Sequence, residues 1–197
     1  MRIGGGKAGG RRLRKRRGPT RAEDGLRPTT ARVRGAIFNI LGPGRVQERR
    51  VLDLYAGTGS LGLEALSHGA HSAEFVEANG SRREEIREAA RRLGLGEAAV
   101  LHRGPVEKVL ARLEGRFGVV FIDPPFKDNP FDWILRTISE KDMLEPDGMV
   151  FAEHSKHTEL LDEYGHLALA DRRRYGDAVV SIYQLSDRGG DEQGKGR

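Results

Sequence analysis

The stretch Val51-Leu52-Asp53-Leu54-Tyr55-Ala56-Gly57-Thr58-Gly59 decides the fold of this 197-residue chain. It begins with strand-forming apolar residues around one acid, a pattern that predicts a short buried strand. The glycines that follow let the backbone turn tightly into a helix expected over 61–67, which ends at His68-Gly69. Because a helix N-terminus offers N–H groups without partners, we expect an anionic or polar ligand at this turn.

The spacing of Gly57, Gly59 and Gly62 satisfies the dinucleotide-binding pattern G-x-G-x-x-G. Glu77 stands 20 residues after Gly57, at the end of the next expected strand, where a carboxylate can hold ribose hydroxyls. This pattern alone leaves two cofactors open, NAD and S-adenosylmethionine. Asp53 favours the second, because a carboxylate under the turn suits the ammonium group of a methionine moiety better than a pyrophosphate. The less specific alternative is that Asp53 is a plain turn former at the strand end.

A second apolar run, Val119-Val120-Phe121-Ile122-Asp123-Pro124-Pro125-Phe126, ends abruptly in an acid, two prolines and an aromatic ring. It predicts a buried strand that delivers a stiff turn, rich in acceptors, to the edge of a sheet. Asp123 and the carbonyl of Pro124 can accept the two N–H bonds of an exocyclic amine. Phe126 can stack on the base, a contact worth about 1 to 3 kcal/mol. The turn therefore indicates a nucleobase amine as the substrate.

Positive charge is concentrated at the N-terminus. Residues 1–17 contain eight basic side chains and no acid, and subtracting them from the formal net charge of +5 leaves −3 for the remainder. Such an arm, interleaved with glycines, can follow the phosphates of a nucleic acid and makes affinity depend steeply on salt. A solvated tail without a specific partner is the plain alternative. Further on, Arg27 precedes Pro28 and is held extended, which suits a loop folding over a cleft.

A helix is expected over 30–41, capped by Thr29 or Thr30 and carrying one apolar stripe. Arg32 and Arg34 lie off this stripe. They can reach RNA phosphates or flank the catalytic turn, although arginines on a helix surface often serve neither purpose.

Three blocks of sequence together resemble one enzyme family. The segment from Asp53 to Gly59 is similar to motif I of class I S-adenosylmethionine-dependent methyltransferases, and that from Asp123 to Phe126 is similar to motif IV of those that methylate exocyclic amines. With Arg27-Pro28-Thr29-Thr30-Ala31-Arg32-Val33-Arg34 and Phe38-Asn39-Ile40-Leu41, they resemble the RsmD family, bacterial enzymes that methylate a guanine N2 in small-subunit (16S) ribosomal RNA. The resemblance runs from about Arg2 to Leu185. It implies S-adenosylmethionine as the cofactor and, as the partner, 16S ribosomal RNA or a partly assembled small ribosomal subunit.

The motifs and the resemblance assign roles to three sets of residues. The catalytic set is Asp123, Pro124, Pro125 and Phe126; the cofactor-binding set is Asp53, Ala56, Gly57, Thr58, Gly59, Glu77, Ala78 and Val106; the RNA-binding set is Lys7, Arg11, Arg12, Arg27, Thr29, Arg32 and Arg34. Two positions depart from the family pattern. Gly35 stands where relatives usually have a glutamate, and Arg103-Gly104-Pro105-Val106 replaces a segment in which many carry an aspartate facing the adenine. The adenine is therefore expected to contact backbone groups and Val106.

The rest of the chain alternates strands and helices with short connections. Strands are expected over 51–55, 72–76, 98–102, 118–122, 149–152, 167–170 and 178–185, a polar turn over 171–177, and a capping box at Ser81-Arg82-Arg83-Glu84. The predicted fold class is α/β: a Rossmann-like class I methyltransferase with a mostly parallel seven-stranded sheet, a C-terminal antiparallel hairpin and helices on both faces. The expected organisation is a basic N-terminal arm over 1–26, the methyltransferase domain over 27–185 with its N-terminal helix 30–41, and a disordered tail over 186–197.

Composition argues against several other classes. Without cysteine the chain has no disulfide, thiolate zinc site or cysteine nucleophile. No run approaches the roughly 20 apolar residues of a membrane span, and the N-terminus lacks an apolar secretion signal, so we expect a cytoplasmic protein. We also expect a monomer. His154 and His157 are spaced to share a helix face, but no third ligand is evident and we expect no metal.

Three other functions remain open at this point. The same turn would serve a methyltransferase acting on adenine N6 or cytosine N4 of DNA. An NAD-dependent oxidoreductase would leave the second proline and the aromatic ring after Asp123 without a role. The third is a non-enzymatic RNA-binding scaffold that keeps the fold.

Overall fold

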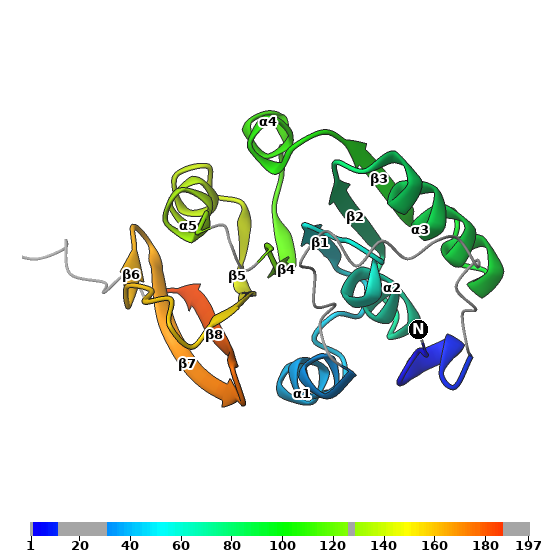
Figure 1. Ribbon diagram of the computed structural model, residues 1–197, viewed down its shortest axis with the longest axis horizontal. Helices are drawn as coiled ribbons and strands as arrows, with labels where there is room; N and C mark the ends of the chain where they lie inside the picture. Colours follow the sequence, from blue (N-terminus) through cyan, green and yellow to red (C-terminus); the bar gives the residue numbers. More distant parts are fainter. Residues whose placement is uncertain (1, 12–30, 126–128, 187–197) are drawn as a thin grey trace, which may run out of the picture.

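The structure is a computed structural model that describes residues 2–11, 31–125 and 129–186 (Figure 1). One mixed sheet runs through it, with strands in the order β3-β2-β1-β4-β5-β8-β7-β6. The strands are β1 (Arg50–Leu54), β2 (Ser72–Glu77), β3 (Ala99–Arg103), β4 (Phe117–Ile122), β5 (Leu144–Ser155), β6 (Glu163–Tyr164), β7 (Leu167–Tyr175) and β8 (Ala178–Leu185). The helices are a 3-10 turn η1 (Gly6–Ala8), α1 (Ala31–Leu41), α2 (Ser60–Ser67), α3 (Gly80–Leu93), α4 (Val106–Arg112) and α5 (Phe131–Glu140).

The sheet is parallel in its first half and antiparallel in its second. β1 pairs in parallel with β2 and β4, and these pair in parallel with β3 and β5. β5, β8, β7 and β6 then follow in antiparallel pairs. The predicted α/β fold class is confirmed, but the described chain has eight strands rather than seven. The additional strand is β6, whose two residues are too short to show an apolar alternation in the sequence.

Two strands are longer than expected. β5 begins at Leu144 rather than at residue 149, and β7 continues to Tyr175 through the polar segment for which the sequence predicts a turn. Arg172, Arg173 and Arg174 pair across the ladder with β8 while their side chains remain exposed. Because an antiparallel sheet can present one face to water, a strand in it can be rich in arginine. The turn between β7 and β8 is therefore only residues 176–177.

Helices cover both faces of the sheet, and side chains alternate along β4 between the two resulting cores (Figure 1). Val119 and Phe121 pack in the cluster that includes α1, α2 and α3. Val120 and Ile122 pack in the cluster that includes α4 and α5. This alternation is the expected consequence of the two-residue period of a strand buried on both faces.

The described part of the expected N-terminal arm, Arg2–Arg11, is packed against the domain. Ile3 is fully buried and Ala8 is 2% exposed, and both belong to the core cluster of α1, α2 and α3. The Ser67 hydroxyl accepts the N–H of Ala8 and donates to the carbonyl of Gly5, at 2.9 and 2.5 Å. These residues of the expected arm thus contribute apolar surface to the core, on the N-terminal side of the expected domain boundary at residue 26. The rest of that arm and the expected tail over 187–197 lie outside the described residues.

The strand order places a topological switch point between β1 and β4. From β1 the chain winds outward through β2 and β3, and it then returns to the other side of β1 as β4 and β5. In open α/β sheets, ligands bind at the carboxyl ends of the strands where the order reverses. In the part of the chain that the structure describes, no helix combines the length and apolarity needed to cross a bilayer.

Candidate functional site

The glycine-rich loop after β1 makes the tight turn that its sequence predicts. Tyr55, Gly57 and Gly59 have φ values of 60°, 54° and 69°, and the Gly59 N–H bonds back to the Ala56 carbonyl at 2.6 Å. A Cβ at Gly59 would come within 3.0 Å of Ile86, whereas one at Gly57 would meet only the Tyr55 carbonyl at 3.7 Å. Gly59 is therefore needed for packing, and Gly57 leaves space through which a ligand can approach the backbone.

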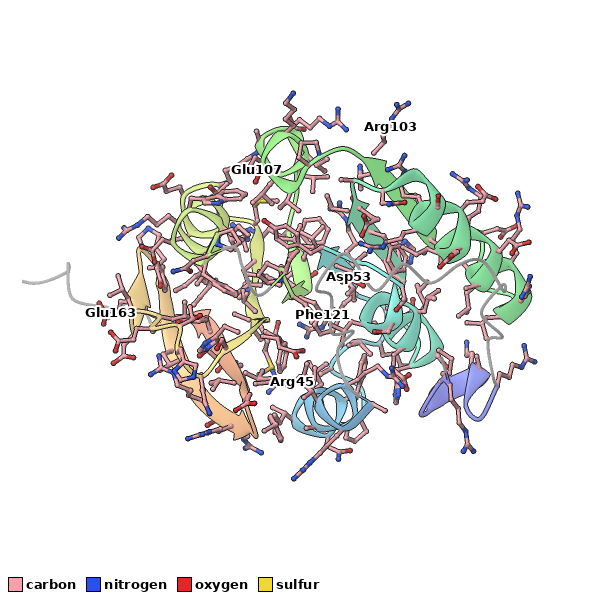
Figure 2. The ribbon with its side chains drawn as sticks, viewed as in Figure 1. Arg45, Asp53, Arg103, Glu107, Phe121 and Glu163 are labelled. Carbon is pink, nitrogen blue, oxygen red and sulfur yellow. The ribbon has the colours of Figure 1, made fainter. Side chains whose placement is uncertain are left out.

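Asp53 lies under this loop and points at α2. Its Oδ2 accepts the backbone N–H of Gly62 at 2.9 Å, and the residue is 2% exposed. Burial raises the pKa of this carboxyl to about 7; the Gly62 N–H opposes the shift, and the charges of Asp123 and Glu77 add to it. The carboxylates of Glu77 and Asp123 thus act on that of Asp53 near the carboxyl ends of the strands, an arrangement that suits a cationic ligand. Figure 2 shows Asp53 near Phe121, its register partner on β4.

Glu77 ends β2 and holds the loop from the other side. Its carboxylate accepts the N–H of Gly57 at 2.9 Å and that of Asn79 at 2.7 Å, and the residue is 7% exposed. Since a carboxylate has about four lone-pair sites, it can also accept ribose hydroxyls. Arg83, to which the sequence assigned no role in the site, donates to the carbonyls of Glu77 and of the exposed Ala78, both at 2.7 Å.

The start of α3 differs from the expected capping box. The helix begins at Gly80, and its cap is Asn79, whose side chain accepts the N–H groups of Ser81 and Arg82 at 2.9 and 3.2 Å. An asparagine at the N-cap satisfies two otherwise unpaired donors. The same residue therefore shapes the loop that follows Glu77.

The expected adenine side of the crevice is formed by the segment before α4. Val106 is 3% exposed and packs in the cluster of α4 and α5, so its side chain presents little surface to a ligand. Gly104 has a φ of 135° and Pro105 precedes the helix. The backbone of this segment, more than the valine side chain, is available for contact.

The turn that the sequence predicts to be catalytic leaves β4 directly beside the glycine-rich loop. Asp123 is half-buried and Pro124 is buried, while Pro125 is partly exposed. Because β1 pairs with β4 in parallel through Leu54 and Ile122, the two segments that follow these strands lie next to each other. Phe126, the fourth member of the predicted catalytic set, lies outside the described residues.

The predicted RNA-binding residues fall into three groups. Lys7, Arg11 and Arg32 are exposed. Arg34 is instead 8% exposed and donates to the carbonyl of Arg2, so it holds the N-terminal segment in place rather than facing solvent. The remaining three, Arg12, Arg27 and Thr29, lie outside the described residues.

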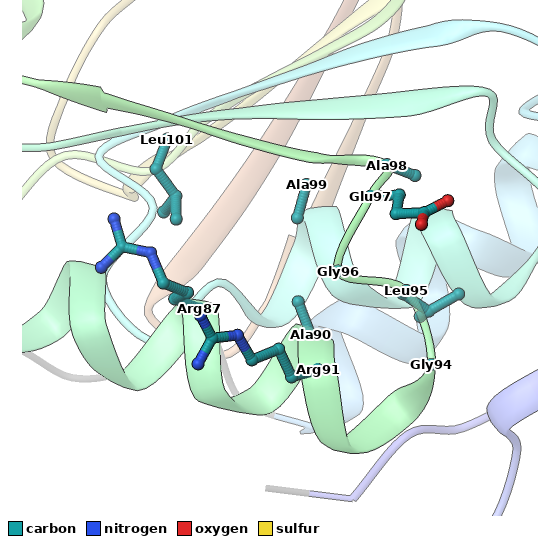
Figure 3. Close-up of a pocket in the computed structure, with 10 residues that line it drawn as sticks. All are labelled: Arg87, Ala90, Arg91, Gly94, Leu95, Gly96, Glu97, Ala98, Ala99 and Leu101. Carbon is teal, nitrogen blue, oxygen red and sulfur yellow. The ribbon is translucent and has the colours of Figure 1, made fainter.

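One hollow in the structure lies away from the Asp123 turn, and another lies beside it. One of about 840 Å³ lies between α3 and β3 and is lined by Arg87, Arg91 and the 94–99 loop among others (Figure 3). It is at the amino end of β3, so it is remote from the chemistry that the turn predicts. Another, too small to hold a water molecule, lies beside Pro124 and Pro125, against the end of β5.

The two histidines considered as metal ligands are not on a helix. His154 is buried on β5, with Nδ1 2.9 Å from the Ser155 carbonyl and Nε2 2.9 Å from the Ser181 hydroxyl. Burial lowers its pKa. His157 is exposed in the turn that follows. Among the described residues, no cluster of three or more histidine, aspartate or glutamate side chains is arranged to hold a metal ion.

The chain is similar to known proteins over nearly its whole length. A family model described as "Conserved hypothetical protein 95" matches residues 1–184. The "Putative rRNA methyltransferase YlbH" of Bacillus subtilis is 36% identical over 187 residues, which cover 93% of this chain and 98% of the relative. The "Ribosomal RNA small subunit methyltransferase D" of Escherichia coli K12 is 30% identical over 189 residues, which cover 96% and 92%.

Solved structures agree with this likeness. The "Putative methyltransferase yhhF from Escherichia coli" matches with a TM-score of 0.81 and 29% identity, covering 94% of this chain and 97% of that one. The SAH-bound methyltransferase PaMTH1 of Podospora anserina matches with a TM-score of 0.66 and 18% identity, covering 85% and 84%, a likeness of fold alone.

Proposed function

Because the chain belongs to the RsmD/YlbH family of class I S-adenosylmethionine-dependent methyltransferases, we propose that it methylates the exocyclic N2 amine of a guanine in small-subunit (16S) ribosomal RNA. The observation that carries the proposal is the parallel pairing of β1 with β4. It brings the glycine-rich loop and the Asp123-Pro124-Pro125 turn side by side at the carboxyl edge of the sheet. A cofactor loop and an amine-binding turn at a shared switch point are what methyl transfer to a ring amine requires.

The residues at this edge of the sheet fit S-adenosylmethionine. When bound, this cofactor supplies an electrophilic methyl group on a positively charged sulfur. Gly57 leaves room for close approach, and Glu77 is placed to accept ribose hydroxyls. Asp53 lies under the loop, where its carboxylate can attract the ammonium group of the cofactor electrostatically or by direct contact. The negative charge shared by Asp53, Glu77 and Asp123 favours a cationic ligand.

The amine-binding turn solves the main chemical difficulty of this substrate. The lone pair of guanine N2 is delocalised into the ring, so the nitrogen is a poor nucleophile until it becomes more pyramidal. Asp123 and the carbonyl of Pro124 accept its two N–H bonds and direct the lone pair toward the methyl group. Asp123 is also placed to take the proton that the methylated nitrogen releases, a role that water can share.

The target base must be unpaired or flipped out of its stack to reach the turn. Phe126 is expected from the motif to stack on it. The exposed Lys7, Arg11 and Arg32 are proposed to contact RNA phosphates, together with Arg12, Arg27 and Thr29 on the strength of the sequence. We also propose that the protein acts as a monomer.

The test is mass-spectrometric mapping of methylated nucleosides in ribosomal RNA from cells with and without this protein. We expect one N2-methylguanosine in 16S RNA to disappear without the protein and to return when purified protein and S-adenosylmethionine are added. Labelled methyl transfer to RNA and to DNA is measured in parallel. Transfer to DNA adenine or cytosine, or no transfer to any nucleic acid, would refute the proposal in favour of a DNA methyltransferase or a scaffold.

A further inference from the structure

Glu153 lies beside the catalytic turn, on the side away from the cofactor loop. β4 and β5 pair in parallel, with Ile122 opposite Ala152. The next residue in each case is an acid: Asp123 follows the end of β4, and Glu153 is on β5. Neighbouring strands are about 4.8 Å apart, so the two backbones that carry these acids are adjacent.

Glu153 also shares a face of the sheet with Asp53. Phe121 and Phe151 both pack in the core cluster of α1, α2 and α3, and each stands two residues before one of the acids. Since side chains alternate along a strand, Glu153 lies on that same face. Asp53 is on it too, because it pairs with Phe121 and bonds to α2. Asp123, the residue after β4, acts electrostatically on Asp53. The carboxylates of Asp53, Asp123 and Glu153 therefore follow β1, β4 and β5 across the sheet, starting under the cofactor loop.

Glu153 is firmly placed in the wall of the site. It is 6% exposed and lines the small hollow together with Pro124 and Pro125. The neighbouring His154 is fixed by the Ser155 carbonyl and the Ser181 hydroxyl, which holds the end of β5 in position. A carboxylate that is ionised can only accept hydrogen bonds, and it has about four lone-pair sites for donors.

Resting on the proposed function, we propose that Glu153 selects guanine by accepting the N–H of guanine N1. Guanine presents two neighbouring donors on one edge, the N2 amine and N1–H. The turn at Asp123 takes the amine, and Glu153, one strand further, takes N1–H. Adenine and cytosine place an acceptor next to their amine, and a carboxylate opposite that lone pair repels it. The amine-binding turn alone would accept all three bases, so Glu153 supplies the discrimination.

The test uses the RNA fragment around the mapped guanosine, synthesised with guanosine or 2-aminopurine riboside at the target. 2-Aminopurine keeps the N2 amine but has a bare acceptor at N1. For the native protein we expect kcat/KM to be about 10³-fold lower with 2-aminopurine. Glu153→Gln offers an N–H to that acceptor, so its preference for guanosine should shrink by at least about 100-fold, with S-adenosylmethionine affinity within about twofold of native. The matched control is Glu159→Gln, an exposed glutamate in the following loop, which should keep the native preference.

Each outcome decides the proposal. An unchanged guanosine preference in Glu153→Gln, or an equal drop in rate with both bases, would overturn the role of Glu153 while leaving the proposed function intact. No methylation of guanosine by the native protein, either in the RNA fragment or in small ribosomal subunits from cells that lack the protein, would instead refute the proposed function. Should Glu153→Gln fail to fold, the base preferences of Glu153→Asp and of the native protein still test the proposal. We expect Glu153→Asp to keep the guanosine preference at a lower rate, and equal use of both bases by the native protein would overturn the proposal.

Discussion

The guanidinium of Arg34 lies 3.4 Å (Nε) from the Glu64 carboxylate and donates to the carbonyl of Arg2 at 2.8 Å. The same carboxylate accepts the backbone N–H groups of Gly4 and Gly5, at 2.7 and 2.9 Å. Glu64 is 3% exposed, so this is a buried charge with several partners. One glutamate on α2 thereby joins α1 to the N-terminal segment.

Replacing Glu64 with glutamine should destabilise the protein by about 3 to 5 kcal/mol, because it leaves the Arg34 charge buried without its counterion. Chemical denaturation measures the decrease in the free energy of unfolding, and hydrogen exchange at Gly4 and Gly5 should accelerate. Glu84→Gln, which breaks an exposed pair with Arg87 on α3, should cost less than about 1 kcal/mol. Equal effects of the two variants would show that the contacts of Glu64 contribute little.

Gly62 has no room for a side chain. A Cβ there would lie 2.3 Å from the Phe75 ring and 3.1 Å from Asp53 Oδ2. Gly62→Ala should therefore cost at least about 1 to 3 kcal/mol through overpacking, and it should weaken cofactor binding by displacing the loop. Gly35→Ala on α1 is the matched control: nothing lies within 4 Å of its Cβ, and helix propensity predicts a gain of up to about 1 kcal/mol. Thermal melting of both variants compares the two positions, and a native melting point for Gly62→Ala would contradict the packing argument.

The buried Asp53 should make stability depend on pH. Burial raises the pKa of its carboxyl to about 7, above the ordinary value of an unfolded aspartate, so the folded state binds more protons between these two values. The contribution of Asp53 is complete below about pH 4 and is lost as the pH rises through about 7. In Asp53→Asn, the free energy of unfolding should depend less on pH between pH 4 and 7, as measured by urea titrations. As a control, Asp142→Asn at an exposed position should have the same pH dependence of stability as the native protein. The same result for Asp53→Asn would show that Asp53 does not titrate in this range.

Removal of the Asp123 carboxylate should separate chemistry from cofactor binding. Asp123→Ala is expected to lower kcat by at least about 100-fold, because the amine loses an acceptor that orients its lone pair. The dissociation constant of S-adenosylmethionine, measured by calorimetry, should change little. Wild-type-like turnover in this variant would exclude Asp123 from the mechanism.

The exposed charges of the N-terminal segment should set part of the salt dependence of RNA binding. Lys7→Gln and Arg11→Gln remove two cations without touching the buried Ile3 and Ala8, which deletion of the segment would also remove. Removing one cation that binds a phosphate should reduce the slope of log affinity against log salt by about 0.7 to 0.9. Filter binding at several salt concentrations gives this slope, and an unchanged value would show that these residues do not bind RNA.

The sequence by itself determined the local elements and the two motifs. The tight turn at Gly57 and Gly59, and the stiff turn at Pro124 and Pro125, follow from the backbone limits of glycine and proline, which act within a few residues. The alternation of buried strands with amphipathic helices likewise indicated the α/β class. The short edge strand β6 and the arginine-rich end of β7 could not be predicted, because their pairing with β7 and β8 respectively holds them more than their own pattern does.

Only the tertiary structure decided which side chains serve the site and which hold the fold. Arg34 has the sequence context of a surface arginine, yet it is buried and pairs with Glu64, which is 30 residues away in the sequence. Glu153 carries no motif of its own, but the register of β4 with β5 sets it beside Asp123. Register and burial depend on contacts between distant segments, so no local pattern could assign them.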